Sequence, residues 1–510
     1  MKRAPTDRAR VVRQFLAGLL AFSQILAPVV AQTSLPALGD GVEMSSSAER
    51  RLGDRIAREL YRDPDYLDDA ILGEYVQGIW QRLMDGARQR GELPPELEER
   101  FAWDVVLGRD RSVNAFALPG GYMGVHLGLI AVVSSEDELA SVLAHELSHV
   151  TQRHIVRIIS RQSNQAPWLI GAMILGALAA SSNPGAAGAM IVGGQAAAVQ
   201  GQLNFSRDME READRVGYGV MTQAGFDARG FVGMFEKLQQ ANRFNDTGAF
   251  PYLRSHPLTT ERIADMQARQ QLQTHTAVPQ LTVTHAMLAA RARMLANPEV
   301  DSLRAALLRA QGEMAAISPA EQAGVLYAAA LGAVGLREFE QAQRWQERLQ
   351  AMVLDDPRAA YQARLLGAEL ALATGDPRRA SMFLEGATPG AGSAVTRPLL
   401  FLRARAQTQS GQPRKAAEQL QVWLASRPRD AQAWQLLSAA YAAQGLTLQA
   451  VRAEAEVHAA RLDYAAARDR LRAAQELARQ GPGVDHVEAS IIDTRSRQID
   501  LLLREQALER

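Results

Sequence analysis

The segment His145-Glu146-Leu147-Ser148-His149 decides how the rest of the chain is interpreted. It follows Ser134-Ser135 and three acidic residues, a pattern typical of a capped helix N-terminus. We therefore predict a helix over Glu136–Ile159. Residues four positions apart on a helix are separated by ~40° around its axis, so both imidazoles project from one face. That spacing suits two nitrogen ligands of one tetrahedral zinc ion.

Glu146 lies beside this histidine pair and is a candidate general base. Zinc lowers the pKa of water towards ~7, and a neighbouring carboxylate can take the proton as the water attacks a carbonyl. The same five residues can also occur by chance on a solvated helix face. The rest of this helix is apolar, however, and includes Leu139, Val142, Leu143 and Val150. Polar groups on a core-facing helix need partners, and a metal supplies them.

A third protein ligand is expected from Glu210, in the segment Glu210-Arg211-Glu212-Ala213-Asp214. On a helix Glu210 and Asp214 share a face. Glu210 can then bind the metal while Asp214 accepts an N–H from a ligating histidine and so fixes its tautomer. Glu212 points ~200° away and is predicted to be a solvated charge.

His154 is predicted to lie outside the ligand set. On a continuous helix it would lie ~180° from His145 and ~140° from His149, so it could not reach the same metal. We expect it to be a surface histidine or one in a second layer around the site.

The composition excludes several classes of protein. The 510 residues include no cysteine, which excludes a disulfide scaffold, thiol catalysis and a cysteine-ligated metal. The 56 Lys and Arg residues balance the 56 Asp and Glu residues, so the net charge gives no reason to expect binding of nucleic acid. An apolar content of 47% excludes general disorder. One zinc per chain, held by histidines and carboxylates, is therefore expected.

The residues before the histidine pair predict a small sheet beside helices, an α+β and mostly helical domain. Helical periodicity over 45–95 is followed by three short β-prone runs, Ala102–Leu107, Val113–Leu118 and Tyr122–Leu127, the last two separated by a Pro-Gly-Gly turn. The run Val113–Leu118 could be an edge strand that binds an extended peptide by main-chain pairing. The alternative is an ordinary internal strand.

Residues 1–31 are predicted to be an export signal that is cleaved near Ala31. A basic start precedes the apolar stretch Phe15–Val30, which ends in small residues. The basic residues are Lys2, Arg3, Arg8, Arg10 and Arg13. A short membrane anchor is the alternative, but polar residues and a proline interrupt the stretch. A cysteine-free exported protein suits the periplasm.

Residues 162–206 contain no charged side chain. They could form a hydrophobic hairpin that makes peripheral contact with a membrane or with an unfolded client. The alternative, which we favour, is a buried helix pair packed beside the active site, because each arm is too short to span a bilayer.

Internal repeats are indicated within residues 276–510. Three glycines each precede an alanine by five positions: Gly375 and Ala380, Gly411 and Ala416, Gly445 and Ala450. In the last unit Trp434, Leu437, Tyr441, Gly445 and Ala450 occur at the offsets of a tetratricopeptide repeat. We predict an all-α repeat solenoid of three to five units, with its C-terminal phase open, against the alternative of a plain helical bundle.

Together these segments resemble a known family. His145–His149, followed by Ser206-Arg207 and Glu210–Asp214, is similar to the zinc metallopeptidases that include the CAAX prenyl protease and HtpX. The segment Val113–Gly121 also resembles that family. With an export signal in front and repeats behind, the chain most resembles the family's periplasmic branch that enhances β-barrel assembly.

This resemblance implies a gluzincin-type peptidase domain over residues 32–275, in which His145, His149 and Glu210 hold zinc and Glu146 is the general base. It also implies a role in the assembly and quality control of outer-membrane proteins. The expected partners are unfolded or misassembled outer-membrane proteins and, through the repeats, the β-barrel assembly machinery.

His256, in Ser255-His256-Pro257, is a further candidate catalytic residue. It could enter the cleft and stabilise an oxyanion, or occupy the open position of zinc as a brake. The resemblance implies a histidine near the metal in this region. The alternative is a loop histidine in front of a helix that Pro257 opens and that Thr259-Thr260-Glu261-Arg262 starts.

The sequence supports two functions of different classes. One is a periplasmic zinc endopeptidase that degrades misassembled outer-membrane proteins and has chaperone activity besides. The other is a non-proteolytic chaperone or assembly adaptor that works through its repeats. A purely structural zinc site is disfavoured. Such sites usually have four protein ligands, most of them cysteines, and this chain has no cysteine.

Overall fold

Six ranges of the chain are described by the computed structural model: 44–161, 206–243, 249–271, 281–388, 395–480 and 485–508. The predicted export signal, residues 162–205 of the uncharged segment and the predicted domain boundary at 275/276 lie outside them. Within the described ranges, no helix is both long enough and apolar enough to cross a membrane.

A mixed four-stranded sheet lies in the first half of the chain, with the strand order β1-β2-β4-β3. The strands are β1 (Tyr66–Leu67), β2 (Asp104–Gly108), β3 (Ala115–Leu118) and β4 (Tyr122–His126). Strands β2 and β4 are parallel, whereas β1 with β2 and β3 with β4 are antiparallel. The expected small sheet is present, and β3 lies at its edge, as the edge-strand interpretation requires.

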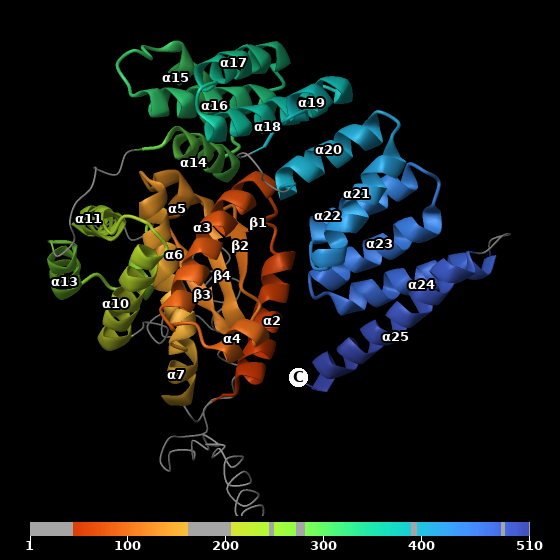
Figure 1. Ribbon diagram of the computed structural model, residues 1–510, viewed down its shortest axis with the longest axis horizontal. Helices are drawn as coiled ribbons and strands as arrows, with labels where there is room; N and C mark the ends of the chain where they lie inside the picture. The colour runs from red at the N-terminus through yellow and green to blue at the C-terminus, as the bar shows by residue number, and fades with distance from the viewer. Residues whose placement is uncertain are drawn as a thin grey trace, which may run out of the picture. The chain divides into compact units, whose positions relative to one another are not determined.

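Helices make up most of the remaining structure between residues 44 and 271, and α3 and α6 lie beside the sheet (Figure 1). They are α2 (Ser46–Arg62), α3 (Ala70–Gln89), α4 (Pro95–Arg100), α5 (Leu127–Val132), α6 (Glu136–Thr151), α7 (His154–Arg161), α10 (Arg207–Gln223), α11 (Arg229–Arg243), α12 (Tyr252–Ser255) and α13 (Thr260–Gln271). The mostly helical α+β class is confirmed for this part of the chain.

The prediction of a single helix over 136–159 is wrong in one respect. The helix is interrupted after Thr151, and a second helix, α7, begins at His154. The helix begins as expected, with the Ser135 hydroxyl accepting the Glu138 N–H at 3.1 Å. It ends at Thr151 because Arg153 adopts φ +52°, in the left-handed region. The Arg153 side chain is tied to the Glu49 carboxylate at 3.1 Å, which stabilises this unusual conformation.

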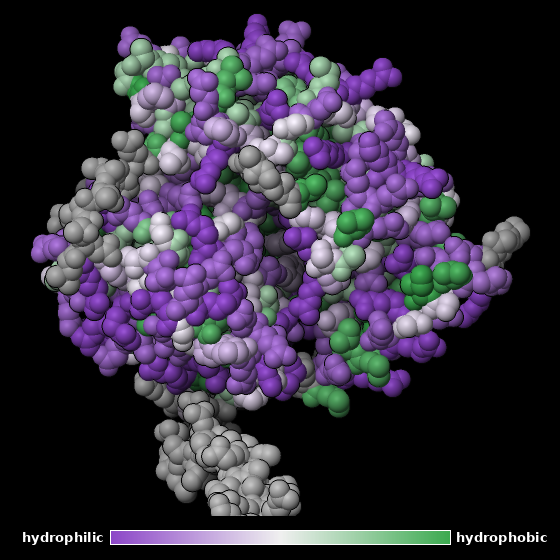
Figure 2. Space-filling view, in the orientation of Figure 1, coloured by the Kyte–Doolittle hydropathy of each residue, from purple (hydrophilic) through white to green (hydrophobic). Residues whose placement is uncertain are grey.

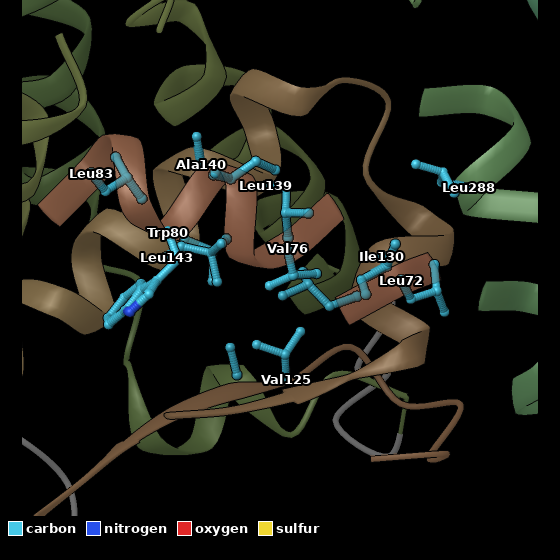
Figure 3. Packing of buried hydrophobic residues seen from close by; sticks show 14 of the residues in the cluster. Leu72, Val76, Trp80, Leu83, Val125, Ile130, Leu139, Ala140, Leu143 and Leu288 are labelled. Atoms are coloured by element: carbon cyan, nitrogen blue, oxygen red, sulfur yellow. The ribbon is translucent and has the colours of Figure 1, made fainter. Parts of the chain in front are cut away.

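The core between the sheet and the helices explains the apolar character of α6 (Figure 3). Fully buried side chains come from α3, β4, α5, α6 and the later helix α14 (Val283–Ala296). Those labelled in Figure 3 are Leu72, Val76, Trp80, Leu83, Val125, Ile130, Leu139, Ala140, Leu143 and Leu288. Because α6 is packed on several sides, its two histidines are held in one orientation.

Residues 281–508 are helical throughout their described parts, and the helices follow one another in chain order (Figure 1). After α14 they are α15 (Val300–Gln311), α16 (Pro319–Gly335), α17 (Phe339–Met352), α18 (Pro357–Ala373), α19 (Pro377–Leu384), α20 (Arg397–Gln409), α21 (Pro413–Ser426), α22 (Ala431–Ala442), α23 (Thr447–Ala460), α24 (Tyr464–Gln480) and α25 (His486–Leu508).

Several of the turns between these helices share one backbone conformation. Gly375, Gly411 and Gly445 have φ of +74°, +77° and +76°. Arg337 and Leu462 take the same conformation at +62° and +61°, each also five residues before a fully buried alanine. The late pattern at Leu462, which leaves the repeat phase open in the sequence, is therefore the turn between α23 and α24.

Two arginines of the C-terminal half bind the acidic pair that precedes α3. Arg397 binds Asp68 at 2.8 Å, and buried Arg291 binds Asp69, the residue that caps α3, at 2.6 Å. These ion pairs connect the helices after residue 281 with the core helix against which α6 packs. Hydrophilic side chains predominate on the face shown in Figure 2.

Candidate metal centre

Four buried side chains converge on one point between α6, α10 and the segment after α12. They are His145 and His149 of α6, Glu210 of α10 and His256, and none is more than 2% exposed. One ligand atom from each lies within 4.8 Å of all the others.

The distances between these atoms match the edges of a tetrahedral metal site. The Nε2 atoms of His145 and His149 are 3.0 Å apart, and each lies 3.5 Å from a carboxylate oxygen of Glu210. His256 Nδ1 lies 3.1 Å from Glu210 Oε1 and 3.3 Å from His145 Nε2. Zinc bonds of ~2.0–2.1 Å place tetrahedral ligand atoms ~3.3–3.4 Å apart.

A glycine lets α10 approach α6 closely enough to form this cluster. A Cβ atom on Gly217 would lie 3.0 Å from the Ala144 carbonyl oxygen and 3.1 Å from the His145 nitrogen. The helix starts at a capped end, where the Ser206 hydroxyl accepts the Met209 N–H at 3.3 Å. Glu210 in its first turn and Asp214 one turn later therefore both reach His145.

Replacing this glycine tests the close approach. We expect Gly217→Ala to lower the free energy of unfolding by ~1–3 kcal/mol, because the added methyl group forces the two helices apart. Gly78→Ala is the matched control, since nothing lies within 4 Å of a Cβ atom at this position of α3. It should stabilise by ~0.5–1 kcal/mol through helix propensity. Urea denaturation measures both, and a stabilised Gly217→Ala variant would contradict the close packing of the two helices.

His145 is oriented by a buried carboxylate and an arginine. Its Nδ1 lies 2.9 Å from Asp214 Oδ1, and Arg262 binds both oxygens of Asp214 at 2.6 and 2.8 Å. Arg262 also reaches Glu210 at 2.7 Å and the Pro257 carbonyl at 2.9 Å. Burial opposes the charged form of His145, but the bonds to Asp214 and Glu210 outweigh it and raise its pKa to about 9. Burial likewise opposes the charge of Asp214, yet Arg262 lowers its pKa.

His149 is oriented by a different set of residues. Its Nδ1 lies 2.9 Å from His154 Nδ1, and His154 Nε2 lies 3.1 Å from Glu212 Oε2. Arg157 binds the same Glu212 oxygen at 2.8 Å. Burial lowers the pKa of His154 to about 4, and it lowers the pKa of His149 well below its usual range.

These contacts test whether the site fits a cation. His145 Nδ1 faces Asp214 and His149 Nδ1 faces His154, so the two Nε2 atoms face each other, and each offers a lone pair to a cation once it has lost its proton. Two lone pairs 3.0 Å apart repel unless positive charge, a shared proton or a metal ion, lies between them. The ionised Glu210 carboxylate, whose pKa is well below its usual range despite burial because His256 and His145 face it, adds a further donor. The residues therefore fit a zinc ion.

Glu146 lies beside the cluster and is completely buried. Its Oε2 accepts the Ala117 N–H of the edge strand β3 at 2.9 Å. Its Oε1 lies 3.4 Å from His256 Nε2, and no described residue donates a hydrogen bond to that oxygen. One oxygen is thus held in place while the other faces the cluster.

Three expectations need correction or refinement. His154 lies in a second layer and not on the surface, because the break at Arg153 brings it back towards His149. Glu212, predicted to be a solvated charge, is partly buried and binds His154 and Arg157. His256 precedes a helix that begins at Thr260, within the segment Thr259–Arg262 expected to start it and three residues after Pro257.

Two residues of the site were missed from the sequence. Arg262 binds Glu210 and Asp214, and an arginine one turn into the helix after His256-Pro257 was the available signal. Tyr252 stacks on His256, with ring centroids 4.4 Å apart and an interplanar angle of 27°. Tyr252 has no sequence signal, because a single tyrosine three residues before Ser255 is unremarkable.

Comparisons with known proteins agree with this geometry. The profile described as peptidase family M48 matches residues 73–270. The beta-barrel assembly-enhancing protease of Escherichia coli strain K12 is 30% identical over 466 residues, which cover 89% of this chain and 90% of that protein. A Vibrio cholerae protein that provisionally carries the same name is 34% identical over 322 residues, 62% of this chain and 64% of that protein. The mitochondrial metalloendopeptidase OMA1 of Saccharomyces cerevisiae is 25% identical over 196 residues, 38% of this chain and 54% of that protein.

A helical domain on a small mixed sheet, with a buried His-His-Glu-His cluster that fits zinc, defines a zinc metallopeptidase. The chain belongs to peptidase family M48 and, within it, to the beta-barrel assembly-enhancing proteases.

Proposed function

We propose that this peptidase works in the periplasm and cleaves unfolded or misassembled outer-membrane β-barrel proteins. The observation that carries the proposal is the buried cluster of His145, His149 and Glu210 with the Glu146 carboxylate directly beside it. The names of the relatives, which are beta-barrel assembly-enhancing proteases, support this class of client. The predicted export signal supports the periplasm.

In this proposal His145 and His149 bind zinc through Nε2, and Glu210 binds it through its carboxylate. When bound, zinc polarises the scissile carbonyl and lowers the pKa of water. Asp214 and Arg262 hold His145 and Glu210 in orientation through the buried ion pairs described above. Their role is to keep the ligand atoms in place before substrate arrives.

Glu146 is proposed as the general base. Oε2 stays fixed by the Ala117 N–H, and Oε1 takes a proton from the attacking water and later delivers it to the leaving amine. A buried carboxylate is effective here because the site excludes competing solvent.

Strand β3 is proposed to bind the substrate. It is the edge of the sheet, and its Ala117 contacts Glu146, so a peptide paired along this edge would pass the cluster. Main-chain pairing is tolerant of sequence, as the degradation of varied unfolded clients requires.

His256 is proposed to act as a brake. Its Nδ1 completes the tetrahedral set of ligand atoms, while its Nε2 faces Glu146 Oε1. In this position it occupies the place that a substrate carbonyl or water needs and also engages the general base. Stacking on Tyr252 supports this placement of the ring.

Removing this histidine should therefore activate the enzyme. If the open state is a minor one, populated at ~10% or less, His256→Ala should raise the cleavage rate of an unfolded protein on the order of tenfold or more. His126→Ala is the control, because His126 is also buried but bonds Ser112 outside the cluster. Initial rates at saturating zinc measure the effect. A rate that falls on the order of a hundredfold in His256→Ala alone would instead assign His256 to transition-state stabilisation.

The helices after residue 281 are proposed to form the tetratricopeptide-repeat solenoid. The recurring left-handed turn five residues before a buried alanine supports it, since small residues at that place let paired helices pack closely. We propose that these repeats bind clients and the β-barrel assembly machinery, and that they carry a chaperone activity.

Cleavage of a purified outer-membrane β-barrel precursor tests the function. We expect the zinc-loaded protein to cleave the urea-unfolded precursor and to spare the same protein after it has folded in detergent. Chelation of zinc should abolish cleavage, and added zinc should restore it. If the zinc-loaded protein and its His256→Ala variant both leave the unfolded precursor intact while suppressing its aggregation, the adaptor function is correct instead.

A further inference from the structure

His154 is the buried histidine closest to the cluster that the proposed mechanism does not use. It is fully buried, yet it lies five residues after His149 on a different helix, because the chain turns at Arg153. Its ring packs against that of His149, with centroids 4.9 Å apart and planes at 74°. The His154 ring therefore packs edge-to-face against the ring of His149, the proposed metal ligand.

The hydrogen-bonding capacities of the neighbours determine where the protons lie. Glu212, bound to Arg157 at 2.8 Å, is an acceptor, so His154 donates its Nε2–H to Glu212 Oε2. A His149 that binds a metal through Nε2 carries its one proton on Nδ1. His154 Nδ1 lies 2.9 Å from that N–H and accepts it.

We propose that His154, held by Glu212 and Arg157, is a positioning residue that keeps the Nε2 lone pair of His149 directed at the metal site. The role is analogous to that of Asp214 towards His145, but an imidazole takes the place of the carboxylate. The other tautomer of His149 would put a proton on Nε2, 3.0 Å from His145 Nε2, and would leave no lone pair for a metal.

The proposal rests on the assignment of His149 as a zinc ligand, and its test measures zinc affinity directly. His154→Leu keeps the bulk of the side chain and removes the acceptor, so the dissociation constant for zinc, measured by competition with a chromophoric chelator, should rise ~10–100-fold. His154→Asn places an amide oxygen near the position of Nδ1, and it should recover most of the lost affinity.

A matched control separates positioning from general loss of packing. His285 is equally buried, bonds Tyr75 at 2.6 Å and the Val133 carbonyl at 2.9 Å, and lies outside the cluster. His285→Leu should therefore leave the zinc affinity unchanged. Wild-type affinity in a folded His154→Leu variant, or an equal loss in His285→Leu, would overturn the inference.

Two more variants keep the result decisive. If His154→Leu does not fold, Glu212→Leu serves instead, because it removes the acceptor that sets the His154 tautomer at a partly exposed position. It should also weaken zinc binding, and unchanged affinity would overturn the inference. His149→Ala distinguishes failure of the ligand assignment from failure of the positioning role. If His149→Ala binds zinc as tightly as the wild type, His149 is not a ligand. If His149→Ala loses zinc affinity while His154→Leu keeps it, only the positioning role is refuted.

Discussion

Glu146→Gln is expected to reduce the cleavage rate of an unfolded protein by ~10²–10⁴-fold while zinc stays bound. The amide oxygen of glutamine can still accept the Ala117 N–H that now binds Oε2, so the side chain should keep its place. The variant loses the group that can take a proton next to the cluster. Initial rates together with zinc content per chain measure both parts of the prediction.

A control on the same helix makes this result specific. Glu138 is also buried in α6, but it binds the Ser134 N–H at the start of the helix and lies away from the cluster. Glu138→Gln should keep its activity. Both substitutions should be repeated with His256→Ala, so that the brake does not hide the difference. Retention of more than about a tenth of the rate in Glu146→Gln would exclude Glu146 as the general base.

Arg262→Met is expected to lower the free energy of unfolding by ~3–5 kcal/mol, the largest stability effect that we predict. Arg262 is almost completely buried and faces two buried carboxylates, Asp214 at 2.6 Å and Glu210 at 2.7 Å. Removing the cation leaves both carboxylates without their partner, and repulsion between them adds to the loss of solvation. Urea denaturation followed by tryptophan fluorescence measures the effect.

The same helix provides the comparison for Arg262. Arg269 in α13 pairs with Asp265 at 3.0 Å, but both side chains are at least one third exposed. Arg269→Met should therefore change stability by less than ~0.5 kcal/mol. If the two variants unfold at the same urea concentration, the buried network around Asp214 does not stabilise the fold as we infer.

The features that depend on local geometry were predictable from the amino-acid sequence. The spacing of His145 and His149 placed both on one helix face, and in the structure their Nε2 atoms are 3.0 Å apart. Capping at Ser135, the short strands and the glycine turns of the later helices were equally predictable. Each of these depends on dihedral preferences within a few residues, which the residue types themselves set.

The residues that surround this histidine pair are brought together by tertiary packing. Arg262 meets Asp214 across 48 positions of the sequence, and His154 meets His149 only because Arg153 turns the chain. Angular spacing alone places His154 ~180° from His145 and ~140° from His149, because it assumes one unbroken helix. A left-handed arginine is unfavourable locally and is stabilised here by contact with Glu49, 104 positions away. Contacts of this kind depend on the packing of the whole domain, so no local sequence pattern predicts them.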